Sequence, residues 1–154
     1  MIRPVGTALC LALVAAGAGM TQSPDETPGA GEAYLMAGFT PDPYQVELTG
    51  GGAVEAAAMA TGCSGFIAAQ PDFVLSYNAG TMPLIFTVQA RADTTLAIFA
   101  PDGNWYCDDD SGPGLNPSLR FEAPQSGRYD IWVGKLTGPG DVPVRLSVSE
   151  LHGQ

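Results

Sequence analysis

The sequence is poor in basic residues and has no long apolar run. It contains 6 Lys and Arg against 16 Asp and Glu, a formal net charge of -10 at pH 7. Nucleic-acid binding needs clustered basic side chains, so no nucleic-acid partner is expected. No apolar run reaches the about 20 residues of a membrane-spanning helix. The heptad spacing of a coiled coil is also absent.

Histidine is equally scarce, because His152, close to the C-terminus, is the only one. Ser–His and Cys–His nucleophile pairs therefore have no base, and zinc sites of the His/Cys type have too few ligands. We accordingly predict no catalytic residues and no enzyme. A small carboxylate-dependent hydrolase that uses Asp108 or Asp110 with Glu122 is the alternative.

Glycine and proline are abundant. The 154 residues include 20 Gly and 13 Pro, and 45% of the chain is hydrophobic. Such a composition argues against disorder and favours short strands joined by turns. The length is that of one domain.

The first residues have the pattern of a secretory signal. A basic start at Arg3 precedes an apolar run from Val5 to Ala16, and Ala16-Gly17-Ala18 matches a signal-peptidase site. We predict a signal peptide over residues 1–18, with a membrane anchor as the alternative. Residues 19–33 are then a flexible mature N-terminus, 34–150 a single domain and 151–154 a C-terminal tail. The protein should be secreted, to the periplasm or to the medium, without a membrane span after cleavage.

Three cysteines occur, and Cys10 lies within the predicted signal. The remaining pair, Cys63 and Cys107, would face an oxidising compartment, which predicts a disulfide between them. Two buried free thiols are the alternative.

Short apolar runs with a period of two, separated by turn residues, fill the rest of the chain. Alternation of this kind indicates strands with one buried face. We expect an all-β antiparallel β-sandwich, jelly-roll-like, with about eight or nine strands. Gly50-Gly51-Gly52 is expected to be a flexible turn, and Tyr129 is expected to tie a corner through its hydroxyl while its ring packs inside. The expected strands are Tyr44–Leu48, Val54–Met59 (where a short helix competes), Phe66–Ala69, Phe73–Asn78, Leu84–Gln89, Thr94–Ala100, Trp105–Cys107, Ser118–Glu122, Tyr129–Val133 and Val142–Val148.

The order of these pieces matches a known pattern. The segment from Phe73 to Ser149 resembles the bacterial pre-peptidase C-terminal domain, a secreted β-sandwich usually appended to extracellular peptidases. The resemblance implies a non-catalytic accessory domain that helps exported proteins to fold, to persist or to attach to a polymer or surface. It is carried by Tyr77-Asn78-Ala79-Gly80-Thr81, Leu84–Val88, Thr94-Thr95-Leu96, Pro101-Asp102-Gly103, Asp108-Asp109-Asp110, Leu119-Arg120-Phe121, Gln125-Ser126-Gly127-Arg128-Tyr129 and Ile131-Trp132-Val133-Gly134.

Acidic residues gather near the Pro101-Asp102-Gly103 turn. Asp108, Asp109 and Asp110 are consecutive, Asp102 precedes them and Asn116 follows. Ca²⁺ prefers six to eight oxygen ligands of these types. We therefore predict a calcium site formed by these five residues, if the hairpin brings Asp102 opposite the cluster. A solvated acidic turn, answered by Arg120 or Arg128, is the alternative.

Three aromatic residues are candidates for a binding surface. Trp105, Tyr106 and Trp132 could stack on a carbohydrate or a peptide if exposed. Core packing against the disulfide is the alternative. The partner would be an exported protein or an extracellular polymer; a structural envelope protein with a protein partner is a further hypothesis.

Overall fold

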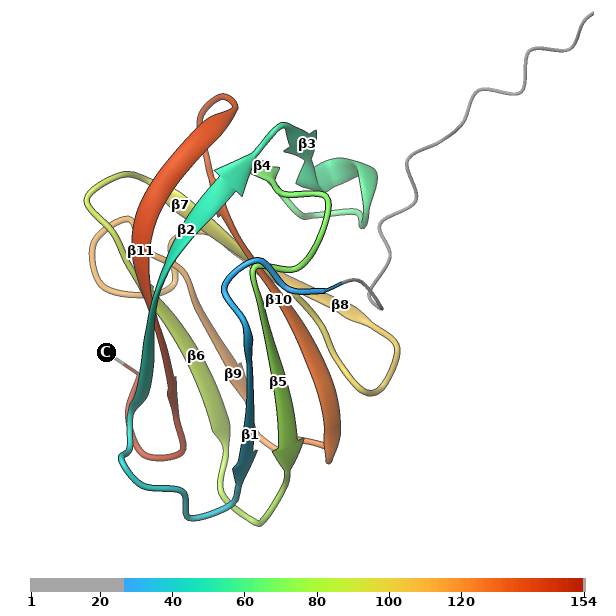
Figure 1. The fold of residues 1–154 in the computed structure, drawn as a ribbon, viewed down its shortest axis with the longest axis vertical. Helices are drawn as coiled ribbons and strands as arrows, with labels where there is room; N and C mark the ends of the chain where they lie inside the picture. The colour runs from blue at the N-terminus through green and yellow to red at the C-terminus, as the bar shows by residue number, and fades with distance from the viewer. Residues whose placement is uncertain (1–26, 154) are drawn as a thin grey trace, which may run out of the picture.

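The computed structural model describes residues 27–153 and shows a β-sandwich of two mostly antiparallel sheets (Figure 1). The predicted signal peptide and most of the predicted flexible N-terminus lie outside these residues. Within them no helix is long and apolar enough to cross a membrane. The elements are β1 (Glu32–Met36), β2 (Tyr44–Gly52), β3 (Val54–Glu55), the 3₁₀ helix η1 (Ala56–Ala58), β4 (Phe66–Ile67), β5 (Phe73–Asn78), β6 (Leu84–Gln89), β7 (Thr94–Phe99), β8 (Trp105–Asp108), β9 (Ser118–Phe121), β10 (Gly127–Lys135) and β11 (Gly140–Ser149).

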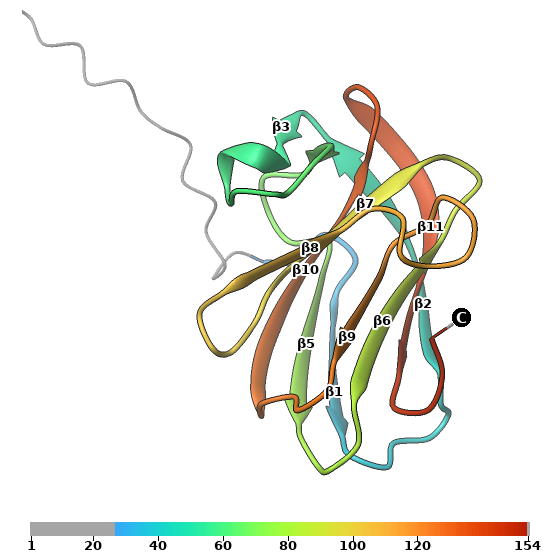
Figure 2. The same cartoon turned by 180° about the vertical axis from the view of Figure 1, so that it is seen from behind.

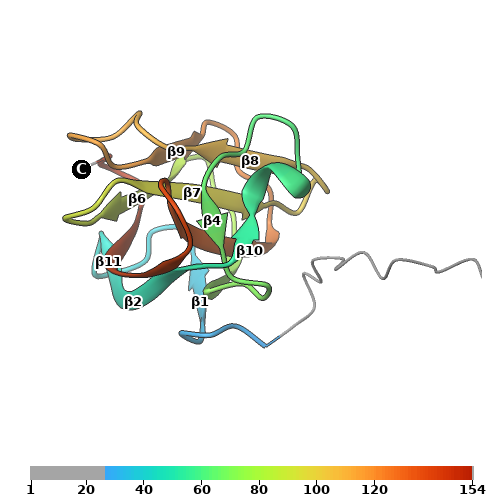
Figure 3. The ribbon, with the colours of Figure 1, turned by 90° about the horizontal axis from the view of Figure 1, so that it is seen from above.

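Sheet A and sheet B divide these strands. Sheet A has the order β1-β5-β10-β4-β3, with β7 also paired to β10 and β8 paired to β7. Sheet B has the order β2-β11-β6-β9. Seen from above, β2, β6 and β11 lie on one side and β4, β8 and β10 on the other (Figure 3). The all-β sandwich is confirmed. The strands number eleven in residues 27–153 because two of them have only two residues.

One strand pair differs from the antiparallel expectation. β1 runs parallel to β5, with Tyr34 opposite Ser76, and both strands point downward in Figure 1. A parallel pair needs a long crossover connection. Here the chain returns through β2 of the other sheet and through β3 and β4, so no crossover helix is required.

The main core fills the space between the sheets, where the alternating apolar residues of both inner faces meet. Tyr129 lies there with 1% of its surface exposed, and its hydroxyl donates a hydrogen bond to the Gln125 carbonyl at 2.8 Å. The predicted corner role of Tyr129 is therefore confirmed. Burial raises its pKa to about 12. Deeply buried members of this core are Leu75, Leu84, Phe86, Leu96, Ile98, Ile131 and Leu146.

The predicted flexible turn at Gly50–Gly52 is wrong. These glycines end β2, where the chain passes from sheet B to β3 of sheet A. A Cβ on Gly50 would lie 2.4 Å from the Val133 carbonyl oxygen, and one on Gly52 would lie 2.1 Å from that of Ile67. The glycines therefore form a corner at which the backbones of the two sheets touch, and strands that switch sheets commonly bend in this way.

A second, smaller core lies on the outer face of sheet A. Residues 54–67, which we call the flap, comprise β3, η1 and β4 and lie against β10, β7 and β8 (Figure 2). The disulfide Cys63–Cys107 joins the flap to β8, with the Cα atoms 5.2 Å apart. The predicted pairing is thus present in the structure, and it holds the flap over the sheet.

Candidate functional site

The acidic cluster is formed at the end of β8. Asp108, Asp109 and Asp110 each offer a carboxylate oxygen, and these oxygens lie within 4.8 Å of one another. Protein donors already form hydrogen bonds to two of these three carboxylates. Asp108 accepts hydrogen bonds from the backbone N–H groups of Ser111 at 3.0 Å and Ser118 at 2.8 Å, and Asp109 accepts one from the Ser64 hydroxyl at 2.9 Å.

Asp102 is not brought to this cluster. The pairing of β7 with β8 places Asp102 in the turn beyond Trp105, whereas Asp108 stands at the other end of β8 opposite Leu96. Three residues of strand separate the two ends by roughly 10 Å. Asp102 instead accepts hydrogen bonds from the Tyr106 hydroxyl at 2.6 Å and the Asn104 N–H at 3.0 Å. The Tyr106 hydrogen bond holds the pKa of Asp102 below its usual value.

Asn116 is also used elsewhere. Its side-chain oxygen accepts a hydrogen bond from the Ala90 N–H at 3.1 Å, and its amide donates to the Pro113 carbonyl at 3.2 Å. These contacts tie the connection between β8 and β9 to the connection between β6 and β7. Asn116 therefore has a structural role that the sequence pattern did not indicate.

The two arginines proposed to neutralise the cluster form ion pairs elsewhere. Arg120 pairs with Glu122 at 2.6 Å in an exposed position. Arg128 pairs with Asp130 at 2.8 Å, and the Asp130 side chain is almost completely buried.

The predicted aromatic surface is wrong for Trp132, because this side chain is fully buried. It packs against half-buried Trp105 with ring centroids 5.0 Å apart, beneath the flap. Tyr106 packs against the main core between the sheets, and the centroids of the Tyr106 and Phe121 rings lie 4.9 Å apart. The tryptophans pack in the same cluster as the disulfide, as the core-packing alternative predicts.

A hollow on the outer face of sheet B was missed by sequence reasoning. It has a volume of about 560 Å³ and lies between the start of β11 and the connection that follows β6. Its polar lining residues are Glu47, Gln89, Arg91 and Arg145. Only the register of three strands reveals it, since Arg145 stands opposite Glu47 of β2 on one side and Gln89 of β6 on the other.

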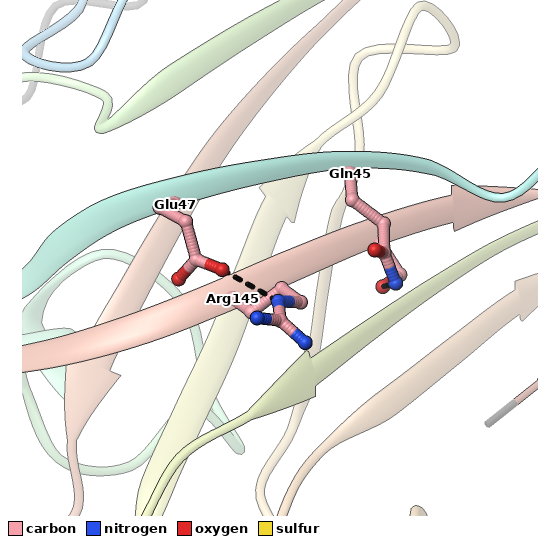
Figure 4. A network of polar contacts seen from close by, with 4 residues as sticks. Gln45, Glu47 and Arg145 are labelled. Atoms are coloured by element: carbon pink, nitrogen blue, oxygen red, sulfur yellow. Dashed lines mark hydrogen bonds and ion pairs between the residues drawn. The ribbon is translucent and has the colours of Figure 1, made fainter. Parts of the chain in front are cut away.

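Arg145 is the best-positioned side chain of this hollow. Its Nε lies 2.5 Å from Oε1 of Glu47 across the strands. Figure 4 shows this contact and shows one terminal nitrogen of Arg145 pointing away from Glu47. One register step along, the Gln45 amide donates to the Ser147 hydroxyl at 3.2 Å. The Glu47–Arg145 and Gln45–Ser147 pairs place donors and acceptors at fixed positions on this sheet.

Asp72 is a buried acid with a raised pKa. It is 5% exposed, and its carboxylate accepts a hydrogen bond from the Val133 N–H at 2.8 Å. Burial raises its pKa to about 7, and the Val133 bond opposes this rise. A raised pKa is common at active sites, but Asp72 fixes the chain before β5 to β10 and does not line the hollow.

Comparison with known proteins gives matches of fold. No protein-family description and no curated protein matches the sequence. A solved structure of the pre-peptidase C-terminal domain of collagenase from Bacillus anthracis matches 81% of this chain and 99% of its own, with 14% identity and a TM-score of 0.46. A periplasmic inhibitor of g-type lysozyme from Aeromonas hydrophila matches 77% of this chain and 96% of its own, with 16% identity and a TM-score of 0.40. The family resembled by the sequence is thus represented among the structural matches.

Proposed function

We propose that this chain is an exported, non-catalytic β-sandwich domain that binds an extracellular or periplasmic ligand through the outer face of sheet B. The observation that carries the proposal is the hollow around Arg145. Glu47, Arg145 and Gln89 come from three adjacent strands, so the backbone register holds them in place before any ligand arrives, and Arg91 lies on the connection that follows β6. Binding sites on regular elements are better ordered than sites on loops.

Export is supported by the disulfide between Cys63 and Cys107, since such bonds persist in oxidising compartments. The signal expected over residues 1–18 belongs to the same proposal. Periplasm and external medium are equally compatible with it.

The proposal of a binding domain is preferred to that of a hydrolase on geometric grounds. Glu47 is the only carboxylate among the described lining residues, and it is paired with Arg145. The alternative pair, Asp108 with Glu122, is separated by β9, because Ser118 at one end of β9 bonds Asp108 and Glu122 follows the other end. The four residue steps from Ser118 to Glu122 span roughly 13 Å of backbone, more than the about 5–9.5 Å between the carboxyl groups of glycosidases.

A panel experiment tests the proposal. The purified chain without residues 1–18 is incubated with insoluble neutral, acidic and basic polysaccharides and with an insoluble fibrous protein. Sedimentation measures binding, and assays for reducing ends and for free amines measure turnover. We expect retention on at least one material with no product. Product release in proportion to protein concentration would overturn the proposal. If the chain is retained on none of the materials but captures one envelope protein, the result would favour a structural envelope protein with a protein partner.

Calcium remains a second proposal, restricted to Asp108, Asp109 and Asp110. The closeness of their oxygens favours it, because a cation would relieve the repulsion among three adjacent charges. Asp102 and Asn116 are left out of the ligand set because other partners engage them. Such an ion would stabilise the connection after β8 and would take no part in the hollow.

A further inference from the structure

The hollow on sheet B concentrates positive charge in an acidic protein. Five basic side chains occur in residues 27–153, and two of them, Arg91 and Arg145, line this one hollow. Glu47 is the accompanying carboxylate, so the local balance is one positive charge in a chain of net charge -10. Charges on the rest of the surface are screened over about 8 Å at physiological salt. The two guanidinium groups of the lining are therefore the positive charges that a small ligand meets in the hollow.

The two arginines offer complementary donors. Arg145 is held at Nε by Glu47, which leaves its terminal nitrogens to bind a planar anion (Figure 4). Arg91 is exposed on the connection between β6 and β7, and it forms no ion pair within residues 27–153. A guanidinium fork matches the geometry of a carboxylate and donates two parallel hydrogen bonds to it. The residual single charge fits a monoanionic carboxylate better than a dianionic phosphate, which Glu47 would repel more strongly.

The hollow lies on the face of a sheet, and this position favours a sugar over a peptide as the molecule that carries the carboxylate. β11 is paired with β2 on one side and β6 on the other, so its backbone groups are already hydrogen-bonded. A peptide strand cannot add to it and gains no main-chain bonds there. A sugar needs only side-chain partners. Oε2 of Glu47 can meet a hydroxyl group, and exposed Pro143 offers an apolar surface to a sugar ring.

We infer that this hollow binds a uronate unit of an acidic polysaccharide, with the sugar carboxylate held between Arg91 and Arg145. The inference rests on the proposed binding function and specifies its ligand class. The volume of about 560 Å³ lies in the usual range for small-ligand sites, roughly 300–1,000 Å³. Glu47 orients Arg145 and accepts a sugar hydroxyl.

Calorimetric titration with tetragalacturonate tests this inference, with the methyl-esterified tetramer and a neutral galactose tetramer as matched ligands. We expect binding of the acid form alone. Arg91→Gln and Arg145→Gln should each weaken it about fivefold or more, the loss of one charge-assisted contact. Arg120→Gln is the matched control, because Arg120 is exposed and lies outside the hollow; it should bind like the unaltered chain. Glu47→Gln keeps an acceptor oxygen but removes its charge, so it should tighten binding.

The outcomes separate this inference from the proposed function. Equal binding of the acid and esterified tetramers, or equal effects of Arg91→Gln and Arg120→Gln, would overturn the uronate site. Tighter binding of an acidic decapeptide than of tetragalacturonate would also overturn it. If the uronate fails but the sedimentation panel retains another polymer, the binding function stands without this ligand. If nothing in the panel is retained, both fail. Thermal unfolding of each variant verifies that it is folded.

Discussion

Trp105 packs against Trp132 with ring centroids 5.0 Å apart and ring planes inclined by 45°, and the disulfide lies in the same cluster. Trp132 is fully buried although it belongs to the outer face of sheet A. Its burial depends on the flap, which Cys63–Cys107 attaches to β8. The bridge thus covers an apolar surface that would otherwise face water.

Removal of the bridge should therefore destabilise the fold and expose the tryptophans. For a loop of 44 residues, Cys63→Ser with Cys107→Ser should cost about 4 kcal/mol in the free energy of unfolding. The tryptophan emission maximum should also shift to longer wavelength below the unfolding transition, because the flap loosens. Denaturant unfolding followed by fluorescence measures both effects. Emission that stays unchanged after loss of the bridge would show that the flap stays in place without it.

The raised pKa of Asp72 should make the stability of the fold depend on pH. The folded state binds its proton with a pKa of about 7, against an ordinary value of 3.8. The contribution of this group to stability is therefore full below pH 3.8 and is lost as pH rises towards 7, by up to about 4 kcal/mol. Asp72→Asn retains an acceptor for the Val133 N–H without the charge. This variant should exceed the unaltered chain in stability above pH 7.

Urea unfolding between pH 4 and pH 9 checks this expectation. The difference in stability between Asp72→Asn and the unaltered chain should grow as pH rises to about 7 and then stay constant to pH 9. Asp141→Asn, at an exposed carboxylate, is the control. A difference that is independent of pH would contradict the assignment to Asp72.

The hydroxyl of Tyr129 should contribute to stability on its own. Tyr129→Phe keeps the buried ring but removes the donor to the Gln125 carbonyl. We expect a loss of about 1 kcal/mol, the usual net value of such a bond. Tyr34→Phe is the matched control, because Tyr34 is 69% exposed. Equal stabilities for the two variants would contradict a stabilising role for the Tyr129 hydroxyl.

Gly50 should not tolerate a side chain. In Gly50→Ala the new Cβ would approach the Val133 backbone oxygen to 2.4 Å, so strand β2 or β10 must shift. Overpacking of this kind costs about 2 kcal/mol. Gly29→Ala should be neutral, since no atom lies within 4 Å of the added group. Thermal unfolding of both proteins decides the matter, and similar midpoints would refute a close contact between the sheets.

Calcium should raise the midpoint of thermal unfolding if Asp108–Asp110 hold an ion. At ten times the dissociation constant the gain is about 1.4 kcal/mol, or several degrees for a domain of this size. A chelator should reverse it. Asp109→Asn with Asp110→Asn should abolish the response, whereas Asp102→Asn should preserve it. The same midpoint with millimolar calcium and with chelator would reject the site.

Local patterns predicted much of the sandwich. Phe73–Asn78 and Leu84–Gln89 form strands with those bounds, because alternation and β-branched residues act within the segment itself. The turn after β7 also follows local chemistry, since Gly103 adopts a positive φ of 79° and its N–H bonds the Ala100 carbonyl.

The features that sequence missed depend on tertiary contacts. A run of glycines normally indicates a turn, but at Gly50–Gly52 the need for close backbone approach decides the conformation. The hollow around Arg145 depends on the pairing of β2, β11 and β6, which lie far apart in the sequence. Trp132 alternates like an exposed residue, and only the flap makes it buried.

The domain should bind its ligand on the outer face of sheet B and leave that ligand chemically unchanged. An NMR titration of the backbone amides of the ¹⁵N-labelled protein with tetragalacturonate tests it most directly. We expect shifts concentrated at Glu47, at Gln89–Ala92 and at Val142, Val144 and Arg145, with the tetramer recovered intact. Shifts centred on Asp108–Asp110 or around the flap, or cleavage of the tetramer during the titration, would contradict it.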